Sequence, residues 1–467
     1  MPYDMTIAGK AVCAEHTLGV TNPADESIFA EAPDCSREQL DTAVAAAAAA
    51  GPAWAADEAR RRQLLKECCE ALKARVGEIA PVLTREQGKP AKNAIGELIG
   101  AALSFLFNAS LELPNELVQD DDNVRIEVRA RPLGVVAAIT PWNFPVLLAC
   151  TKIGPALLAG NTVVLKPSPY TPLSTLMMGE VLRDVLPPGV LNVVSGGDDV
   201  GAWLSEHPLV RKISFTGSVA TGKRVAAAAA PDLKRITLEL GGNDAAIVLP
   251  DADPGRIAEK LFWSAFDNCG QTCAAIKRIY AHESIYPALL EALSDVARGV
   301  KTGDGTDPSS QLGPINNRPQ FERVCELVED ARSHGAKPLV GGARMGERGY
   351  FFSPTLLSEV SDGVRVVDEE QFGPVLPVLP YSDIEDAVAR ANATHFGLGG
   401  SVWGADLERA SEVASQLDCG TAWVNSHLSL VPYAPFGGRK WSGLGLENGK
   451  WGMRGYCELQ TFHTTKV

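Results

Sequence analysis

The sequence predicts an α/β protein built on parallel sheets. From Gly134 onward, short apolar runs that read as buried strands alternate with helix-like segments, which is typical of βαβ units. A second series of apolar runs extends from about residue 245 to residue 430, so a second α/β layer is expected. The 467 residues exceed what one core usually holds, and this length suggests about three domains.

The N-terminal part is expected to hold a small hairpin layer followed by helices. Residues 7–35 contain short β-like runs and a turn signal at Asn22–Asp25. Ser36 followed three residues later by Gln39 is a capping-box pattern, and the alanine-rich run after it favours a helix. Two further amphipathic helices are expected around Glu58–Val76 and Lys92–Leu111.

Residues 124–129 alternate Val and Ile with Arg and Glu. This period of two indicates a strand with one apolar face. The strand lies far along the chain from the other predicted strands, so it is either an arm that contacts a partner subunit or a solvated hairpin.

The two α/β layers can be laid out from the apolar runs. In the first, strands are expected at Val135–Thr140, Thr162–Leu165, Leu191–Val194, Lys212–Phe215 and Ile236–Leu240. The helices between them are expected near 146–159, 172–185, 199–206 and 219–229. In the second, strands are expected at Ala246–Leu249, Ile279–Ala281, Val375–Val378, Gly400–Trp403 and Thr421–Val424. We expect the first layer to bind a dinucleotide.

Composition narrows the class of partner. Hydrophobic residues make up 45% and charged residues 21%, which is ordinary for a globular protein, and the net charge of −14 argues against binding nucleic acid. The N-terminus lacks a secretory pattern, and no apolar stretch is long enough to span a membrane. The ten cysteines are scattered without a CxxC motif, which suits reduced thiols in a cytoplasmic protein without a metal site.

The chemistry is expected to centre on Glu239 and Cys273. Glu239 lies inside a run that reads as a buried strand, and Cys273 follows thirty-four residues later in a polar segment rich in Asn, Gly and Gln. A thiolate beside a general base is the usual arrangement for covalent catalysis on a carbonyl. Cys269 lies four residues before Cys273 and is either a second reactive thiol or a buried spectator.

Gly217 to Arg224 follow one of the predicted strands and begin a predicted helix. Glycines at this place let a backbone approach a phosphate at the helix N-terminus. The spacing matches most of a P-loop, but Arg224 stands where the P-loop hydroxyl that binds Mg²⁺ is required. Contact with a phosphate is therefore preferred over an NTPase site, and a plain tight turn is the alternative.

Two further loops follow predicted strands. Pro141–Pro145 is held by two prolines and presents Asn143, whose side-chain amide is suited to donate a hydrogen bond to an oxyanion, although such a loop is often purely structural. Lys166 ends the next strand, where it can reach a ribose or a phosphate, and a surface lysine is the alternative. Glu370 precedes a strand in the second layer and says little by itself.

Taken together, these segments resemble the NAD(P)-dependent aldehyde dehydrogenase superfamily over nearly the whole chain. PWNFP, KPS, FTGS, LELGG, GQTC, EEQFGP and PFGGRKWSGLG occur in the family's order and at plausible spacing. Any one of these motifs is weak evidence, whereas seven in order are very specific.

The resemblance implies a reaction and a set of site residues. Cys273 is the expected nucleophile, Glu239 the base that activates water, and Asn143 an oxyanion donor together with the Cys273 backbone N–H. The expected cofactor is NAD or NADP, held by Ile139, Thr140, Trp142, Lys166, Ser168, Gly197, Gly201, Phe215, Gly217, Ser218, Leu240, Glu370 and Phe372. The expected substrate pocket consists of Phe144, Leu148, Thr151, Asp267 and Thr272.

The resemblance also implies a domain plan and a homodimer or homotetramer. A Rossmann-like NAD(P)-binding domain is expected at 1–112 and 134–240, an α/β catalytic domain at 241–440, and a β-hairpin oligomerisation arm at 113–133 and 441–467. The implied reaction is oxidation of an aldehyde to its carboxylic acid through a thiohemiacetal and a thioester on Cys273. The rivals are a thiol-dependent esterase that uses Cys273 without a cofactor, and a structural role without catalysis.

The chain departs from the family pattern in four places. Pro169 stands where many NAD-preferring relatives carry a glutamate that binds the ribose hydroxyls. Because that carboxylate would repel a 2′-phosphate, its absence leaves NADP⁺ admissible as the cofactor. Thr151 replaces a common tryptophan and Asp267 a common aromatic residue, so we expect a wider and more polar substrate tunnel. Leu446 replaces a common arginine, and nothing in the sequence explains it.

Overall fold

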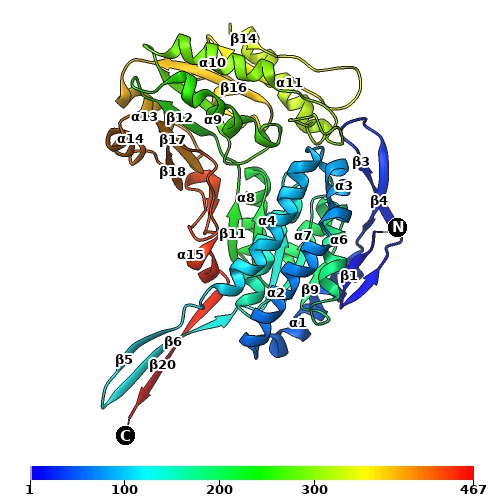
Figure 1. The fold of residues 1–467 in the computed structure, drawn as a ribbon. Coiled ribbons are helices and arrows are strands. Elements are labelled where there is room, and N and C mark those ends of the chain that lie inside the picture. Colours follow the sequence, from blue (N-terminus) through cyan, green and yellow to red (C-terminus); the bar gives the residue numbers. More distant parts are fainter. Residues whose placement is uncertain (1–2, 467) are drawn as a thin grey trace.

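The computed structural model describes residues 3–466 and consists of two α/β lobes and a projecting arm (Figure 1). One lobe carries an 8-stranded sheet and the other a 7-stranded sheet. The three-stranded arm extends from the first lobe, with the C-terminal strand along one side (Figure 1). Within residues 3–466 no helix is both long and apolar enough to cross a membrane.

The first sheet has a parallel centre. Its strand order is β19-β11-β10-β7-β8-β9-β1-β2, and all pairings from β11 to β9 are parallel. Its strands are β1 (Met5–Ile7), β2 (Lys10–Val12), β7 (Val135–Ile139), β8 (Thr162–Lys166), β9 (Leu191–Val193), β10 (Val210–Thr216), β11 (Arg235–Glu239) and β19 (Gly443–Leu444). The chain runs outward from β7 through β8 to β9 and then returns to β10 on the other side of β7. This reversal creates a switch point between β7 and β10, where α/β sheets bind ligands.

The helices of this lobe cover both faces of the sheet. They are α1 (Arg37–Ala55), α2 (Glu58–Ala74), α3 (Val76–Gln87), α4 (Ala91–Ser110), α5 (Pro145–Leu158), α6 (Leu173–Arg183), α7 (Asp198–Glu206) and α8 (Val219–Ala229). Because parallel crossovers are right-handed, α5 and α6 lie on one face and α7 and α8 on the other. Helix α1 packs with α7, whereas α2 to α4 form a second layer beyond α5 and α6.

The N-terminal predictions are confirmed with additions. Ser36 caps α1 with both hydrogen bonds of a capping box to Gln39. The expected hairpin layer is two hairpins: β1 with β2, and a separate pair formed by β3 (His16–Thr21) and β4 (Ile28–Asp34). Helix α3 was not predicted, since only Arg75 separates it from α2.

The second sheet is buried on both faces. Its order is β14-β15-β16-β13-β12-β17-β18, and only the β14 pairing is antiparallel. Its strands are β12 (Asp244–Val248), β13 (Ile276–His282), β14 (Lys337–Val340), β15 (Thr355–Ser358), β16 (Val375–Tyr381), β17 (Gly399–Trp403) and β18 (Thr421–Val424). Along β12, Ala245 and Ile247 enter one core cluster and Ala246 and Val248 enter another, as alternation in a doubly covered strand requires.

Helices on the two sides complete these clusters. One side carries α9 (Pro254–Phe266) and α10 (Tyr286–Gly299). The other carries α11 (Arg318–Ser333), α12 (Arg365–Asp368), α13 (Ile384–Asn392) and α14 (Leu407–Ala414). Short helical turns η1 (Asp267–Gly270) and η2 (Lys440–Ser442) and helix α15 (Gly449–Arg454) lie in the connections.

The arm consists of β5 (Glu116–Asp120), β6 (Val124–Pro132) and β20 (Cys457–Thr465) in the order β20-β6-β5. The predicted apolar face of 124–129 is not a buried one, because all these side chains are half-buried or exposed. Part of the predicted arm segment 441–467 also packs elsewhere: β19 pairs with β11 in the first sheet, and α15 packs against α5. The segment that joins the arm is β20.

Candidate active site

The site lies where the two parallel sheets meet end to end. Strand β11 ends at Glu239, and β12 begins only five residues later at Asp244. The carboxyl edge of the first sheet therefore faces the amino edge of the second. Loops that leave β7, β8 and β10 approach loops that enter β12, β13 and β16. The predicted site residues lie on these loops, at the ends of the adjoining strands, or on α5 and at the start of α7.

Cys273 lies in a tightly constrained loop before β13. Asn268, Cys269 and Gly270 have φ values of 52°, 60° and 72°, three successive left-handed residues. At Gly270 a Cβ would come 2.2 Å from the Gly373 carbonyl oxygen, so only glycine fits. Lys277 holds the loop by donating from Nζ to the carbonyls of Gly270 (3.1 Å) and Thr272 (2.8 Å).

The surroundings of Cys273 oppose its ionisation. Burial is the largest of the causes that raise the pKa of the thiol to about 12; the nearby carboxyl groups of Glu239, Glu370 and Asp244 contribute to the rise, and Lys277 opposes it. The thiol therefore needs a proton acceptor or a nearby positive charge before it can attack. Cys269 is buried deeper, with 1% exposure, and burial alone raises the pKa of its thiol to about 12.

Glu239 is a candidate proton acceptor for the Cys273 thiol. Its side chain is buried, and neither carboxylate oxygen forms a hydrogen bond with another described residue. Burial raises its pKa well above 4.5, Glu447 adds to the rise, and Lys152 opposes it. A buried carboxylate with free acceptor oxygens and a raised pKa is suited to take a proton from a thiol or from water.

Asn143 connects the loop after β7 to the loop that carries the nucleophile. Its Nδ2 donates to the carbonyl of Gln271 over 2.9 Å, two residues before Cys273. A primary amide has a second N–H, so one donor remains for another acceptor. Asn143 is buried, and its Oδ1 forms no hydrogen bond with a described residue.

The predicted cofactor residues of the first lobe gather around the switch point. Ile139 and Thr140 end β7, Phe215 lies near the end of β10, and Ser218 caps α8 by accepting from the Thr221 N–H at 3.2 Å. Gly217 is tightly packed, because a Cβ there would lie 2.6 Å from the Phe215 ring. The remaining residues are Trp142 after β7, Lys166 and Ser168 at the end of β8, Gly197 and Gly201 at the start of α7, and Leu240 after β11.

These residues fit a dinucleotide. Lys166 is buried, and among residues 3–466 its Nζ donates only to the neighbouring Pro167 carbonyl; burial lowers its pKa to about 8. The hydroxyls of Thr140 and Thr216 are buried without a hydrogen-bond partner among the described residues. Gly197 has open space where a Cβ would stand. Unpaired donors and hydroxyls at the carboxyl edge of a parallel sheet suit phosphates and ribose.

The second lobe adds Glu370 and Phe372. Glu370 accepts from the Gly242 N–H at 3.1 Å, and burial raises its pKa to about 7 although Lys277 opposes the shift. The Phe372 ring meets Trp142 edge to face, with 5.2 Å between centroids. Residues predicted from motifs about 230 positions apart are thus brought into contact across the two lobes.

The predicted pocket residues fall on two segments. Phe144 precedes α5, and Leu148 and Thr151 lie three residues apart on it, hence on one face; the Thr151 hydroxyl is turned back to the Leu148 carbonyl at 3.1 Å. Asp267 follows α9 as its C-cap residue, and burial raises its pKa. Thr272 is buried, and its hydroxyl lacks a partner among the described residues.

The sequence analysis missed a buried ion pair beside Glu239. Lys152 of α5 bonds to Glu447, and their side chains are 0% and 7% exposed. The signal was available in part: Lys152 is the only charged residue in the apolar stretch 147–158, and a charge there requires a partner. It also missed Lys89, Glu97 and Gln271, which belong to the hydrogen-bond network around Asn143.

Comparison with known proteins agrees with this geometry. The model of the aldehyde dehydrogenase family matches residues 12–462. Retinaldehyde dehydrogenase 3 of Rattus norvegicus is 39% identical over 94% of this chain and 88% of its own, and the chloroplastic betaine aldehyde dehydrogenase of Beta vulgaris is 38% identical over 96% and 92%.

Solved structures match equally well. The NAD⁺ complex of an aldehyde dehydrogenase from Bacillus cereus has a TM-score of 0.97, with 34% identity over 100% of this chain and 97% of its own. An NADP-dependent enzyme from E. coli has a TM-score of 0.97, with 36% identity over 99% and 98%. The chain belongs to the aldehyde dehydrogenase family.

Proposed function

We propose that this enzyme oxidises an aldehyde to the carboxylic acid with Cys273 as the nucleophile, Glu239 as the base and Asn143 as an oxyanion donor. The observation that carries the assignment is the meeting of these three groups between the sheets. The thiol is near enough to Glu239 for the carboxylate to raise its pKa, and Asn143 is hydrogen-bonded to Gln271, two residues before it.

The first half of the reaction forms a covalent adduct. The thiol gives its proton to Glu239, and the sulfur attacks the aldehyde carbon, so that the carbonyl oxygen becomes an oxyanion. The free N–H of the Asn143 amide and the backbone N–H of Cys273 stabilise this charge. A bound nicotinamide supplies the acceptor for the hydride that leaves the same carbon, and the carbonyl then reforms as a thioester.

The second half of the reaction releases the acid. Glu239 first releases to solvent the proton that it took from the thiol. It then removes a proton from water, the hydroxide attacks the thioester, and the same two N–H groups stabilise the second oxyanion. The bond between carbon and sulfur then breaks, and the thiolate recovers a proton. The raised pKa of Glu239 favours this role, since a stronger base removes a proton from water more readily.

The cofactor is proposed to lie across the switch point of the first sheet. Lys166 and Ser168 would hold the ribose, Gly217 and Ser218 would face the phosphates, and Glu370 would hold the nicotinamide ribose. Pro169 supplies no carboxylate to repel a 2′-phosphate, so both NAD⁺ and NADP⁺ are proposed as cofactors.

The substrate is proposed to be a polar or bulky aldehyde rather than a small alkyl one. Asp267 and Thr151 supply a carboxyl group and a short side chain at positions of the expected tunnel. If Asp267→Phe leaves the preference between polar and alkyl aldehydes unchanged, this part of the proposal is wrong.

Self-association through the arm, as a homodimer or homotetramer, is also proposed. Strand β5 is exposed along its whole length, with Leu117 54% and Val118 55% exposed, which is costly for an edge strand left in water. Light scattering of wild type and of Leu117→Lys/Val118→Lys tests it: a wild-type monomer would refute the proposal. A cytoplasmic location is proposed from the ten cysteines, all of which are free thiols.

The reaction is tested by following reduced cofactor in parallel assays with NAD⁺ and NADP⁺ and a broad panel of aldehydes. Cys273→Ala should abolish reduction, whereas the matched variant Cys269→Ala should retain it. Aldehyde oxidation by Cys273→Ala would refute the assignment of the nucleophile. Ester hydrolysis without cofactor at a rate above aldehyde oxidation would favour the esterase.

A further inference from the structure

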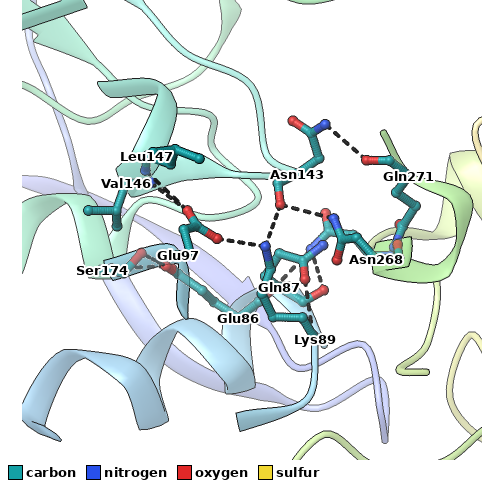
Figure 2. Close-up of polar contacts among 11 residues, drawn as sticks. Glu86, Gln87, Lys89, Glu97, Asn143, Val146, Leu147, Ser174, Asn268 and Gln271 are labelled. Atoms are coloured by element: carbon teal, nitrogen blue, oxygen red, sulfur yellow. Dashed lines mark hydrogen bonds and ion pairs between the residues drawn. The ribbon is translucent and has the colours of Figure 1, made fainter. Parts of the chain in front are cut away.

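We propose that Lys89 and Glu97 are positioning residues for the oxyanion hole, acting through the backbone of Asn143. The proposal rests on the role proposed above for the Asn143 side chain. Neither residue touches the reacting atoms. Their effect is to fix the loop from which the Asn143 amide projects (Figure 2).

Lys89 is a buried cation with a complete set of contacts. Its side chain is 1% exposed, and Nζ donates to Glu97 Oε2 over 2.6 Å and to the Asn143 carbonyl over 2.8 Å. Nζ also lies 3.9 Å from the centroid of the Phe144 ring. A carboxylate, a carbonyl oxygen and the face of an aromatic ring all attract a cation. Lys89 therefore holds both Asn143 and the next residue, Phe144.

Glu97 fixes the other end of the same loop. Its Oε1 accepts from the backbone N–H groups of Val146 and Leu147 at 3.0 and 3.2 Å, which are N-terminal amides of α5 (Figure 2). The residue before α5, Phe144, provides no side-chain cap of its own. A carboxylate at a helix N-terminus satisfies free donors and is favoured by the helix dipole. Lys89 and Glu97 thus fix the Asn143 loop at two places, the Asn143 carbonyl and the N-terminus of α5.

The nucleophile loop is tied to the same carbonyl. Asn268 Nδ2 donates to the Asn143 carbonyl over 3.1 Å, so that this oxygen receives two donors. Gln271 Nε2 donates to the Asn268 carbonyl over 2.9 Å, and the Gln271 carbonyl receives the Asn143 amide. A closed circuit of hydrogen bonds therefore joins Asn143, Asn268 and Gln271, and Lys89 is attached to this circuit at the Asn143 carbonyl.

This arrangement explains why a charged pair is buried here. Exchanging a buried ion pair for apolar residues of similar volume is often neutral or stabilising, so stability alone is a poor reason for its presence. Lys89 is instead the group that holds the Asn143 carbonyl, while the side chain of the same residue must keep one N–H aimed at an oxyanion. A donor displaced by about 1 Å can cost about 10²-fold in rate.

The test is a double-mutant cycle on kcat/KM for aldehyde oxidation. Lys89→Met/Glu97→Gln removes both charges, while the glutamine oxygen still accepts from the α5 amides. We expect about a 10- to 10²-fold loss of kcat/KM, together with unchanged cofactor affinity. In an Asn143→Ala background the same double change should cost less than about twofold, because the donor it positions is already absent.

Two further variants complete the design. Lys89→Arg keeps a donor for the Asn143 carbonyl and should recover most of the lost activity. Lys234→Met is the matched control, since Lys234 is also buried and donates to the Ser205 carbonyl at 3.0 Å, outside the described network. Its kinetics should equal those of wild type.

The outcomes separate the two proposals. If Asn143→Ala retains full kcat/KM, the oxyanion role of Asn143 is refuted. If Asn143→Ala is impaired but the Lys89 and Glu97 changes cost the same factor in both backgrounds, the positioning role alone is overturned. If the double variant does not fold, the comparison is made with Lys89→Met alone, which removes the donor to the Asn143 carbonyl; an equal loss in both backgrounds likewise overturns the proposal.

Discussion

Replacing Gly242 by alanine should slow catalysis through the backbone of the nucleophile. A Cβ at Gly242 would lie 2.6 Å from the Cys273 carbonyl oxygen, 2.8 Å from Asp244 Oδ1 and 3.1 Å from Leu398 Cβ. Ordinary contact begins at 3.4 Å, so the Cys273 carbonyl must retreat by about 0.8 Å. The obstacle is backbone, which cannot rotate aside as the end of a flexible side chain can.

Two effects of different size follow from this displacement. Overpacking of this kind costs about 1–3 kcal/mol of folding stability, which the enzyme can survive. Misplacing the nucleophile by nearly 1 Å should lower kcat/KM by about 10- to 10²-fold. Activity should therefore suffer much more than folding.

Initial rates of cofactor reduction and thermal melting of the same preparations measure both effects. Gly77→Ala is the control, because the added methyl meets nothing within 4 Å at an exposed position of α3 and should be neutral or slightly stabilising. If Gly242→Ala retains kcat/KM within twofold of wild type, the steric reasoning about the Cys273 carbonyl is wrong.

Three further predictions concern the charges around the thiol. With a thiol pKa raised to about 12, Cys273 without cofactor should react slowly with iodoacetamide at neutral pH and faster at every step up to pH 10; a plateau below pH 9 would contradict the assigned surroundings. Glu239→Gln should give one slowed turnover of reduced cofactor, because the thiol loses its proton acceptor, and should then stall at the thioester. In wild type the raised carboxyl pKa means that the base form grows as pH rises, so a rate limited by thioester hydrolysis should increase with pH through neutrality, and a flat profile would argue against Glu239 as the base. Glu447→Gln leaves the Lys152 cation buried and unpaired and should cost about 3–5 kcal/mol in stability, whereas Lys152→Met/Glu447→Leu should recover most of it in melting curves; equal losses would count against the ion pair.

The strands that build the site were predictable because buried parallel strands are continuous apolar runs. The expected Thr162–Leu165 and Leu191–Val194 differ from β8 and β9 by one residue each. Glu239, Cys273 and Asn143 were singled out from their residue types and from short motifs, and their catalytic roles stay predictions. Local features of this kind are recorded in neighbouring residues, so a single sequence suffices to find them.

The features that escaped prediction depend on distant partners. Lys152 and Glu447 lie 295 residues apart, and no local pattern joins them. The raised pKa of Cys273 follows first from burial and then from three carboxyl groups that arrive from β11, β12 and the loop before β16. Helix α3 was missed for a different reason, since Arg75 supplies none of the Gly or Pro signals that usually separate helices.

The three-stranded arm also has a consequence for how the chain folds. Its first two strands, β5 and β6, are neighbours in sequence, but β20 pairs with β6 only after the whole of the second lobe, with a bond from Arg131 to Gln460 that spans 329 residues. During synthesis, the edge of β6 that pairs with β20 stays unpaired until most of the chain has emerged. Such an edge invites mispairing. The arginines along β6 and Glu127, which is bonded to both Arg125 and Arg129, keep this unpaired edge hydrated and discourage wrong strands from adding to it.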